Sequence, residues 1–414
     1  MSQSFPLDDV RARFPALAEE AGRIFLDNPA GTQVPDLVID AVSDCFRRAF
    51  GNLGGYFATS RLAEETVARA HRQAALFCGA AGPQEIAIGA SMTELTYAVG
   101  RAIARRLEPG DEIVVTSMDH EGNVSPWLQV AEDYGLTLRK IRFDDRSWRI
   151  EPGALAEVLN TRTKLLAVTY ASNLSGAINP VAELTALAKQ AGALVYVDAV
   201  QFAPHGLIDV AALGCDFLVC SAYKFFGPHI SMLWGREEVL QALPADRLRC
   251  AAAAPGGRFE RGTPQIELQA GFSAAIDYML RLGRSLGAEA APRNALAAAF
   301  GASQAYEADL MRQMIEGLTA IPGLTLRGPA DLQRLDRRVP TFSVTSDRVS
   351  SRGMAAALAV RGIHAWSGHN YAYEIALQLG LDMDDGVLRL GAAHYNSAEE
   401  IARTLNALED IARG

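Results

Sequence analysis

A lysine set among aromatic residues is the strongest chemical signal in the sequence. Lys224 lies between Tyr223 and Phe225, directly after the apolar run 216–220. Burial disfavours an ammonium group and lowers its pKa, which suits a nucleophilic amine. Most lysines are instead exposed surface residues, so this interpretation depends on the residues that accompany Lys224.

An acidic residue ends another apolar run upstream of this lysine. Asp198 closes the run 193–198 and is followed closely by Gln201. A carboxylate in an apolar place needs a partner, and a helix cap or a salt bridge is the ordinary explanation. A protonated pyridine nitrogen would also serve. Enzymes that use pyridoxal 5′-phosphate (PLP) keep the cofactor ring electron-poor in this way.

Both residues belong to a region in which strand and helix patterns alternate. Apolar runs of strand length occur at 112–116, 164–170, 193–198, 216–220 and 230–235. Helical spacing of apolar residues occurs at 35–50, 62–78, 127–134 and 182–192. This alternation predicts an α/β domain with a mostly parallel sheet, whose ligands bind at the carboxyl ends of the strands.

The pattern changes after about residue 290. Helices are predicted at 294–318, 351–361 and 397–411, the last capped by Ser397. The segment 323–327 follows the first of these helices, and strands are predicted at 340–344 and 387–390. We therefore expect a large α/β domain over 21–290 and a smaller α+β domain over 291–414. Roughly the first 20 residues should pack with the smaller domain.

Composition excludes several classes of protein. The 414 residues are 49% hydrophobic and 21% charged, which is ordinary for a globular chain, and the net charge of −9 disfavours nucleic acid and anionic membranes as partners. No stretch of 18 apolar residues and no signal peptide is evident. Five scattered cysteines without a CxxC pair predict neither disulfides nor a metal site, and favour a cytoplasmic location.

Several separate motifs follow one another in an order that is typical of one family. They occupy 25–31, 89–94, 118–123, 172–176, 195–201, 221–229, 261–264, 387–391 and 395–396. On these motifs the chain resembles the class V, fold-type I PLP-dependent enzymes, and within them the cysteine desulfurase and selenocysteine lyase group. The resemblance implies a fold-type I enzyme with PLP as its cofactor.

The resemblance also implies roles for individual residues. Lys224 would be the Schiff-base lysine, Asp198 the partner of the pyridine nitrogen and His120 the residue that stacks on the ring. The implied cofactor-binding residues are Ser91, Met92, Thr93, His120, Asn173, Asp198, Gln201, Ser221, Tyr223, Lys224 and Thr263. Thr263 would reach the phosphate of a neighbouring subunit, which implies a homodimer with shared active sites.

The substrate side of the site follows from the same resemblance. Arg389 would hold the α-carboxylate of an amino acid, a role that suits the guanidinium fork. The other implied substrate-binding residues are Asn28, Ala30, Gly31 and His369. Trp366, Tyr373 and Tyr56 are further candidates for the pocket wall, but spacing alone does not place them.

One position departs from the desulfurase pattern. Desulfurases take sulfur as a persulfide on a cysteine that precedes the final strand, and Tyr371 stands at that position here. No cysteine follows Cys250, which is the one alternative acceptor worth testing. Tyr371 is either a catalytic acid or base or a wall of the pocket.

These observations predict a PLP enzyme that acts on an amino acid through an external aldimine and a quinonoid. A carbon–sulfur or related lyase without a persulfide cysteine is the first choice. A class V aminotransferase or an amino-acid epimerase is the alternative, and a conventional cysteine desulfurase or selenocysteine lyase is the third. A catalytically silent scaffold is disfavoured by the presence of Lys224, Asp198, His120 and Arg389 together.

Overall fold

The computed structural model describes residues 5–20, 22–49, 51–251, 254–288 and 291–413. Its largest feature is a seven-stranded sheet in the order β2-β8-β7-β6-β5-β3-β4, in which only β8 runs antiparallel to its neighbours. Its strands are β2 (Ile86–Gly89), β3 (Glu112–Thr116), β4 (Thr137–Ile141), β5 (Thr163–Thr169), β6 (Leu194–Asp198), β7 (Phe217–Ser221) and β8 (Ser231–Gly235).

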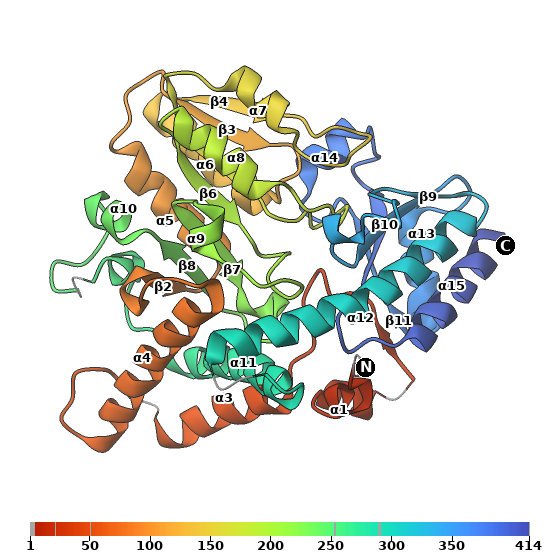
Figure 1. Cartoon of the computed structure of the whole chain (residues 1–414), viewed down its shortest axis with the longest axis horizontal. Coiled ribbons are helices and arrows are strands. Elements are labelled where there is room, and N and C mark those ends of the chain that lie inside the picture. Colours follow the sequence, from red (N-terminus) through yellow and green to blue (C-terminus); the bar gives the residue numbers. More distant parts are fainter. Residues whose placement is uncertain (1–4, 21, 50, 252–253, 289–290, 414) are drawn as a thin grey trace.

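Helices cover both faces of this sheet because its central strands are apolar on both sides (Figure 1). Along β6, Val195 and Val197 face one core, and Tyr196 between them faces the other. The helices of this part are α3 (Asp36–Arg48), α4 (Ala58–Cys78), α5 (Met92–Ala104), α6 (Ser125–Tyr134), α7 (Pro152–Val158), α8 (Val181–Gln190), α9 (Val210–Leu213), α10 (Glu237–Ala242) and α11 (Ile266–Ser285).

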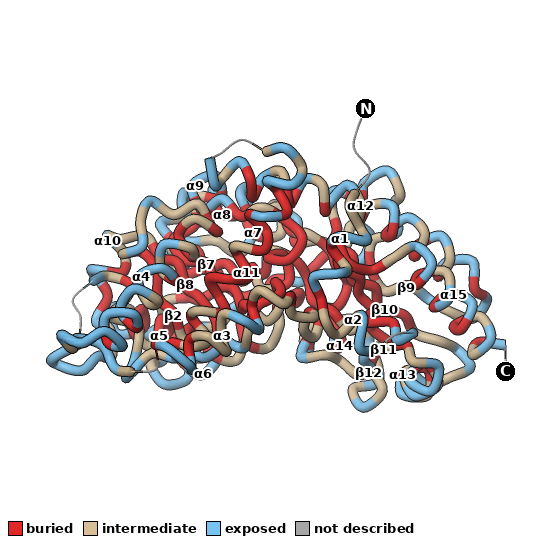
Figure 2. Tube along the Cα trace, turned by 90° about the horizontal axis from the view of Figure 1, so that it is seen from below, coloured by how far each residue is buried: buried red, intermediate tan, exposed pale blue. Residues whose placement is uncertain are grey.

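A smaller, antiparallel sheet forms the other side of the molecule. Its order is β12-β13-β10-β9, with β9 (Leu324–Leu326), β10 (Thr341–Ser346), β12 (Trp366–Gly368) and β13 (Val387–Gly391). The surrounding helices are α13 (Ser351–Val360), α14 (Tyr373–Gln378) and α15 (Ala398–Arg413). Figure 2 shows buried segments inside both halves and exposed helix surfaces around them.

One long helix takes part in both cores. α12 (Pro292–Ala320) places Leu296 and Phe300 in the core of the large sheet, and Leu310 and Met314 in that of the small sheet. The predicted boundary near residue 290 thus falls just before an element that the two cores share, and residues 289 and 290 themselves lie outside the described residues.

The N-terminal segment also touches both sides. It comprises α1 (Leu7–Arg11), α2 (Pro15–Glu19) and β1 (Ile24–Phe25), which pairs with β11 (Ile363–His364). Phe14 packs in the large core against Tyr278, whereas Arg11 forms an ion pair with Glu400 of α15 at 2.9 Å. The sequence predicts that this segment packs with the smaller domain, and its contacts extend to the larger one as well.

The predicted fold class is confirmed, and most elements lie where the sequence places them. β3 has its predicted bounds, and the other predicted strands of the large sheet lie within one residue of theirs. The predicted cap of α15 is present, since Ser397 Oγ accepts a hydrogen bond from Glu400 N at 3.1 Å. Phe50, the last residue of one predicted helix, lies outside the described residues.

Candidate active site

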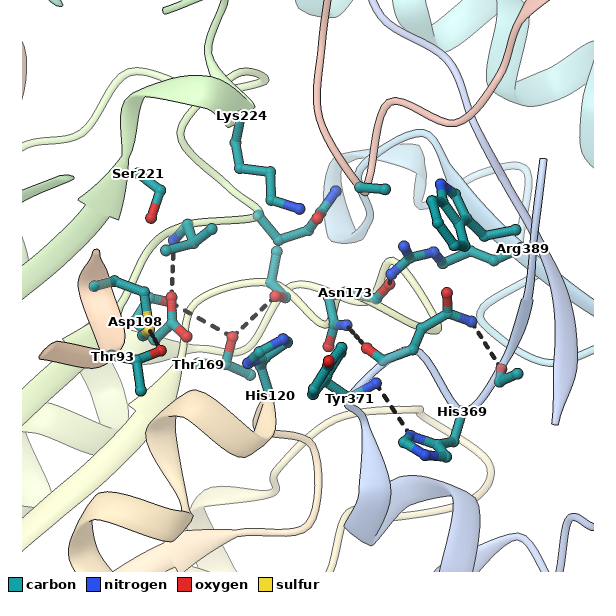
Figure 3. A pocket seen from close by; sticks show the side chains of 18 of the residues that line it. Thr93, His120, Thr169, Asn173, Asp198, Ser221, Lys224, His369, Tyr371 and Arg389 are labelled. Carbon is teal, nitrogen blue, oxygen red and sulfur yellow. Dashed lines mark hydrogen bonds between the residues drawn. The ribbon is translucent and has the colours of Figure 1, made fainter. Parts of the chain in front are cut away.

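A pocket of about 790 Å³ lies where the carboxyl ends of the large-sheet strands meet the small sheet. Figure 3 shows side chains from both sides pointing into it. The predicted site residues that line it are Ala30, Ser91, Met92, Thr93, His120, Asn173, Asp198, Gln201, Ser221, Tyr223, Lys224, His369, Tyr371 and Arg389. Residues from the whole length of the sequence therefore converge on one cavity.

Lys224 reaches this pocket from a short 3₁₀ turn, Ala222–Lys224, directly after β7. Its Nζ donates a hydrogen bond to the carbonyl of Pro29 and lies 4.9 Å from the centre of the Tyr223 ring. Burial, with the nearby charge of Arg389, lowers the pKa of Lys224 to about 7. A large share of this amine is therefore neutral, and hence nucleophilic, near neutral pH.

Asp198 is the last residue of β6 and is buried. Val200 N donates a hydrogen bond to its Oδ1 at 2.9 Å. Burial raises the pKa of Asp198 to about 6, while this hydrogen bond and the charge of Lys224 act in the opposite direction. At neutral pH the carboxyl group is mainly ionised, and it can pair with a cationic ring nitrogen.

His120 lines the pocket as a neutral imidazole. Burial, together with the charges of Lys224 and Arg389, lowers its pKa to about 3. Its Nδ1 accepts a hydrogen bond from Gly122 N at 2.9 Å, so the neutral ring carries its hydrogen on Nε2. The neighbouring Asp119 is fully buried and accepts from Asn123 at 2.7 Å, which anchors the turn that carries the imidazole.

A helix N-terminus faces the same cavity. α5 begins at Met92, with two residues between it and the end of β2, and Ser91 Oγ caps it by accepting from Glu94 N at 3.2 Å. The first amides of a helix have no partners within it, and its dipole favours an anion at this end. Ser91, Met92, Thr93 and Ser221 line this part of the pocket, so it suits a phosphate group.

Arg389 supplies the cationic group on the opposite side. It lies in the middle of β13 with only 5% of its surface exposed, and its Nη1 donates to the carbonyl of Asn173 at 2.9 Å. Burial lowers its pKa to about 10, so the guanidinium stays charged at neutral pH. A buried cation of this kind favours an anionic ligand such as a carboxylate.

The loop 369–372, between β12 and α14, lines the remaining side and has an unusual backbone conformation. Asn370 and Tyr371 have φ angles of 52° and 58°, a left-handed region that side chains other than glycine rarely occupy. Asn173 Nδ2 donates to Asn370 O at 2.8 Å, and Glu121 N donates to Tyr371 O at 2.7 Å. The Tyr371 ring lies 5.4 Å from the His120 ring at an interplanar angle of 26°.

Three predicted residues do not line the pocket. Asn28 is buried outside the pocket lining, and its amide donates to the carbonyls of Phe25 and Gly391 while its oxygen accepts from Tyr395. Gly31 packs against the Tyr223 ring, and Thr263 lies on the exposed surface. Their implied contacts with substrate or with a neighbouring subunit stay predictions.

Other lining residues were missing from the predicted site. Thr169, Ala171 and Val200 lie beside the ends of β5 and β6, so their position after an apolar run is a usable signal. The remainder come from the small-sheet side and carry no recognisable motif; they are Ser367, Gly368, Asn370, Met383 and Asp384. Of the candidate wall residues, Trp366 lines the cavity, whereas Tyr56 and Tyr373 do not.

The arrangement fits PLP. Among the described residues, the buried atoms Asn173 Oδ1, Gln201 Oε1 and Arg389 Nε have no hydrogen-bond partner although their residues line the pocket. PLP carries a phosphate, a ring nitrogen that can be protonated and a hydroxyl group. The start of α5 suits the phosphate, Asp198 suits the ring nitrogen, and the side-chain amides of Asn173 and Gln201 suit the hydroxyl group. The amine of Lys224 is available to react with the aldehyde group of PLP.

Comparisons with known proteins agree with this geometry. The family model Aminotransferase class-V matches residues 24–404. A cysteine desulfurase from Pectobacterium atrosepticum is 32% identical, and the match covers 99% of each chain; one from Serratia proteamaculans is also 32% identical, over 99% of this chain and 98% of the relative.

Solved structures show the same relationship. The apo structure of a cysteine desulfurase from Thermococcus onnurineus NA1 matches with a TM-score of 0.88 and 28% identity, covering 100% of this chain and 99% of that one. A cysteine desulfurase from Escherichia coli matches with a TM-score of 0.84 and 25% identity, over 99% and 98% of the two chains. The chain therefore belongs to the class-V aminotransferase family of PLP-dependent enzymes and is similar along nearly all its length to the cysteine desulfurases.

Proposed function

We propose that this enzyme cleaves the carbon–sulfur bond of a sulfur-containing amino acid and releases the sulfur directly as a thiol. The observation that carries the proposal is the environment of Tyr371, which lines the pocket in the loop where the desulfurases carry their acceptor cysteine. A phenol cannot take up sulfane sulfur. The residues that line this pocket include no cysteine.

The cysteines elsewhere in the chain are poor substitutes. Cys45, Cys78, Cys215 and Cys220 are buried, and burial raises the pKa of both Cys78 and Cys215 to about 12, which suppresses the reactive thiolate. Cys250 is exposed but lies outside the pocket lining. All five are free thiols, which is our reason for proposing a reducing, cytoplasmic location.

The cofactor would be held by residues already described. Ser91, Thr93 and Ser221 would hold the phosphate, Asp198 the ring nitrogen and His120 one face of the ring. The chemistry that PLP supplies when bound is withdrawal of electrons from the α-carbon of the substrate. Arg389 would orient that substrate through its α-carboxylate.

Lys224 would act as the base. Its amine removes the proton from the α-carbon, and the electron pair left there forms a bond between the α- and β-carbons. The β-carbon–sulfur bond breaks at the same time, and its electron pair leaves with the sulfur, which takes up a proton. With one molecule of water, an amino acid R–S–CH₂–CH(NH₃⁺)–COO⁻ yields R–SH, pyruvate and ammonium, so atoms and charge balance.

In this proposal Tyr371 supplies the proton to the leaving sulfur, which is supported by its position in the pocket lining beside His120. Tyr371→Phe should therefore lower kcat by about tenfold or more and leave the affinity for PLP unchanged. Steady-state kinetics and a cofactor titration measure the two quantities. Unchanged kinetics would mean that Tyr371 shapes the pocket without taking part in catalysis.

The enzyme class and the reaction type can be tested separately. Holoenzyme should show the absorbance band of a cofactor bound to lysine, and protein that stays colourless with added PLP would contradict the assignment as an enzyme. Products from sulfur-containing amino acids are then assayed for thiol, sulfide, pyruvate, amino-group transfer and α-hydrogen exchange. Thiol and pyruvate in equal amounts are expected, whereas a trapped protein persulfide would overturn the proposal.

We also propose a homodimer. Side chains exposed on α3, on α4 and on the segment between them include Ile39, Leu53, Tyr56, Phe57 and Leu62. Apolar groups gathered in this way mark a contact surface, and the resemblance makes a second copy of the chain its occupant. Light scattering should give twice the chain mass, and Phe57→Glu should weaken the assembly. A wild-type mass of one chain would contradict the dimer.

A further inference from the structure

We infer that Trp366 and Tyr371 form a subsite for an uncharged apolar or aromatic group carried on the sulfur of the substrate. This inference rests on the proposed function and specifies its substrate class. The preferred substrate is then an S-substituted cysteine rather than free cysteine.

The register of the small sheet places Trp366 beside the carboxylate-binding residue. Trp366 in β12 is the direct antiparallel partner of Arg389 in β13. Side chains of directly opposed residues stand on the same face of a sheet, with their Cβ atoms about 5 Å apart. Both residues line the pocket. A substrate held by Arg389 therefore lies next to the indole.

The two aromatic rings mark the open end of the cavity. Trp366 keeps 52% of its surface exposed and Tyr371 keeps 67%, while Arg389 keeps 5%. Lys224 lies at the other end, beside Asp198 and the start of the cofactor cradle. A group attached to the sulfur would extend outwards and cover the exposed rings. The side chain of free cysteine ends at the sulfur and leaves both rings largely in water.

The charge at the rim disfavours a second anionic group. Asp384 lines the pocket and is exposed, so its carboxylate adds a negative charge at this end of the pocket. Arg352 donates to the backbone carbonyl of Asp384. Arg389 already accounts for one carboxylate at the inner end, so an acidic substituent on sulfur would meet repulsion at the outer end. The subsite therefore selects uncharged groups.

The test compares S-phenylcysteine with S-methylcysteine on holoenzyme, with thiol release as the readout. Wild-type enzyme should favour S-phenylcysteine by about tenfold or more in kcat/KM. Trp366→Ala should remove most of that preference, and Trp366→Phe should restore a large part of it. If Trp366→Ala leaves the ratio of kcat/KM for the two substrates unchanged, the subsite is refuted.

Tyr373 provides a matched control. It is an aromatic residue of the same region, 43% exposed, and it lies outside the pocket lining. Tyr373→Ala should leave the preference unchanged, and an equal effect of both alanine variants would argue against a specific role for Trp366. Asp384→Asn should improve turnover of S-(4-carboxyphenyl)cysteine relative to S-phenylcysteine, and an unchanged ratio would remove Asp384 from the selection.

A binding measurement separates this inference from the proposed function. Each amino acid is titrated into holoenzyme, and the cofactor absorbance reports half-saturation without any need for turnover. Tighter binding of S-phenylcysteine that depends on Trp366, but with no thiol released, would leave the subsite intact and refute the lyase. Thiol release without a Trp366-dependent preference for S-phenylcysteine would support the lyase and refute the subsite.

Discussion

The two sides of the pocket are built in different ways. On the large-sheet side, Asp198 ends one buried parallel strand and Lys224 follows another, and burial is the main cause of the pKa shift of each. On the small-sheet side, Trp366 and Tyr371 are exposed and come from a short edge strand and a left-handed loop. The interior strands fix the reactive groups, whereas the rim can vary without disturbing them.

Removal of Lys224 should have the largest effect on turnover, and it tests the large-sheet side of the pocket, which we call the inner side. Lys224→Ala should lower turnover by roughly a thousandfold or more, because nucleophile and base are lost together. The absorbance band of lysine-bound cofactor should disappear as well. Lys164→Ala, near the amino end of β5, is the control and should change neither. Retention of the band in Lys224→Ala would assign the cofactor to another amine.

The next effect belongs to the small-sheet side. Arg389→Lys should raise KM by roughly 10- to 100-fold and affect kcat less, since a lysine cannot form the paired hydrogen bonds of the guanidinium fork. Arg338→Lys is the contrast, because Arg338 is equally buried but lies outside the pocket lining. That variant should lower the melting temperature without a selective rise in KM. Equal KM values for wild type and Arg389→Lys would contradict the assigned role.

A pH series tests whether burial lowers the pKa of Lys224. With a pKa of about 7, half of Lys224 is neutral at pH 7, and this share falls by roughly fivefold at pH 6. The rate at which apoprotein captures PLP should fall by a similar factor. Stopped-flow absorbance at a fixed PLP concentration measures it. A rate that first declines at much higher pH would mean that Lys224 behaves as an exposed lysine.

The smallest effect concerns the loop at the rim. Asn370→Gly and Asn370→Ala both remove the side-chain hydrogen bond to Gly368 O, which measures 2.7 Å. Only glycine adopts the φ of 52° without strain, so the glycine variant should be more stable than the alanine variant by about 1 kcal/mol. Denaturant unfolding gives the difference. Equal stabilities would show that the loop relaxes at no cost.

The sequence predicted the inner side better than the rim, and the reason is physical. A buried parallel strand requires a continuous apolar run, so β5, β6 and β7 can be recognised in the sequence. The residues at the carboxyl ends of these strands are then predicted to lie at the same edge of the sheet. The elements that were missed lack such a signal. The 20-residue helix α11 is buried around most of its surface, so it shows no clear apolar stripe, and β4 is an edge strand with the polar residues Arg139 and Lys140.

The rim escaped prediction because it depends on contacts between distant segments. The pairing of Trp366 with Arg389 follows from the register of β12 on β13, which no local pattern specifies. The left-handed conformation of Tyr371 is likewise held by hydrogen bonds from Glu121 and Asn173 to the loop, across more than 190 residues of sequence. Family resemblance supplied the position of Tyr371 but not its geometry.

The helix shared by the two cores has a consequence for how the protein unfolds. Because α12 carries Phe300 into one core and Leu310 into the other, loss of either core would expose apolar surface on the same continuous helix. Neither half is then an independent cooperative unit, and calorimetry of the protein should record a single heat-absorption peak. The two walls of the pocket would be lost together at one temperature.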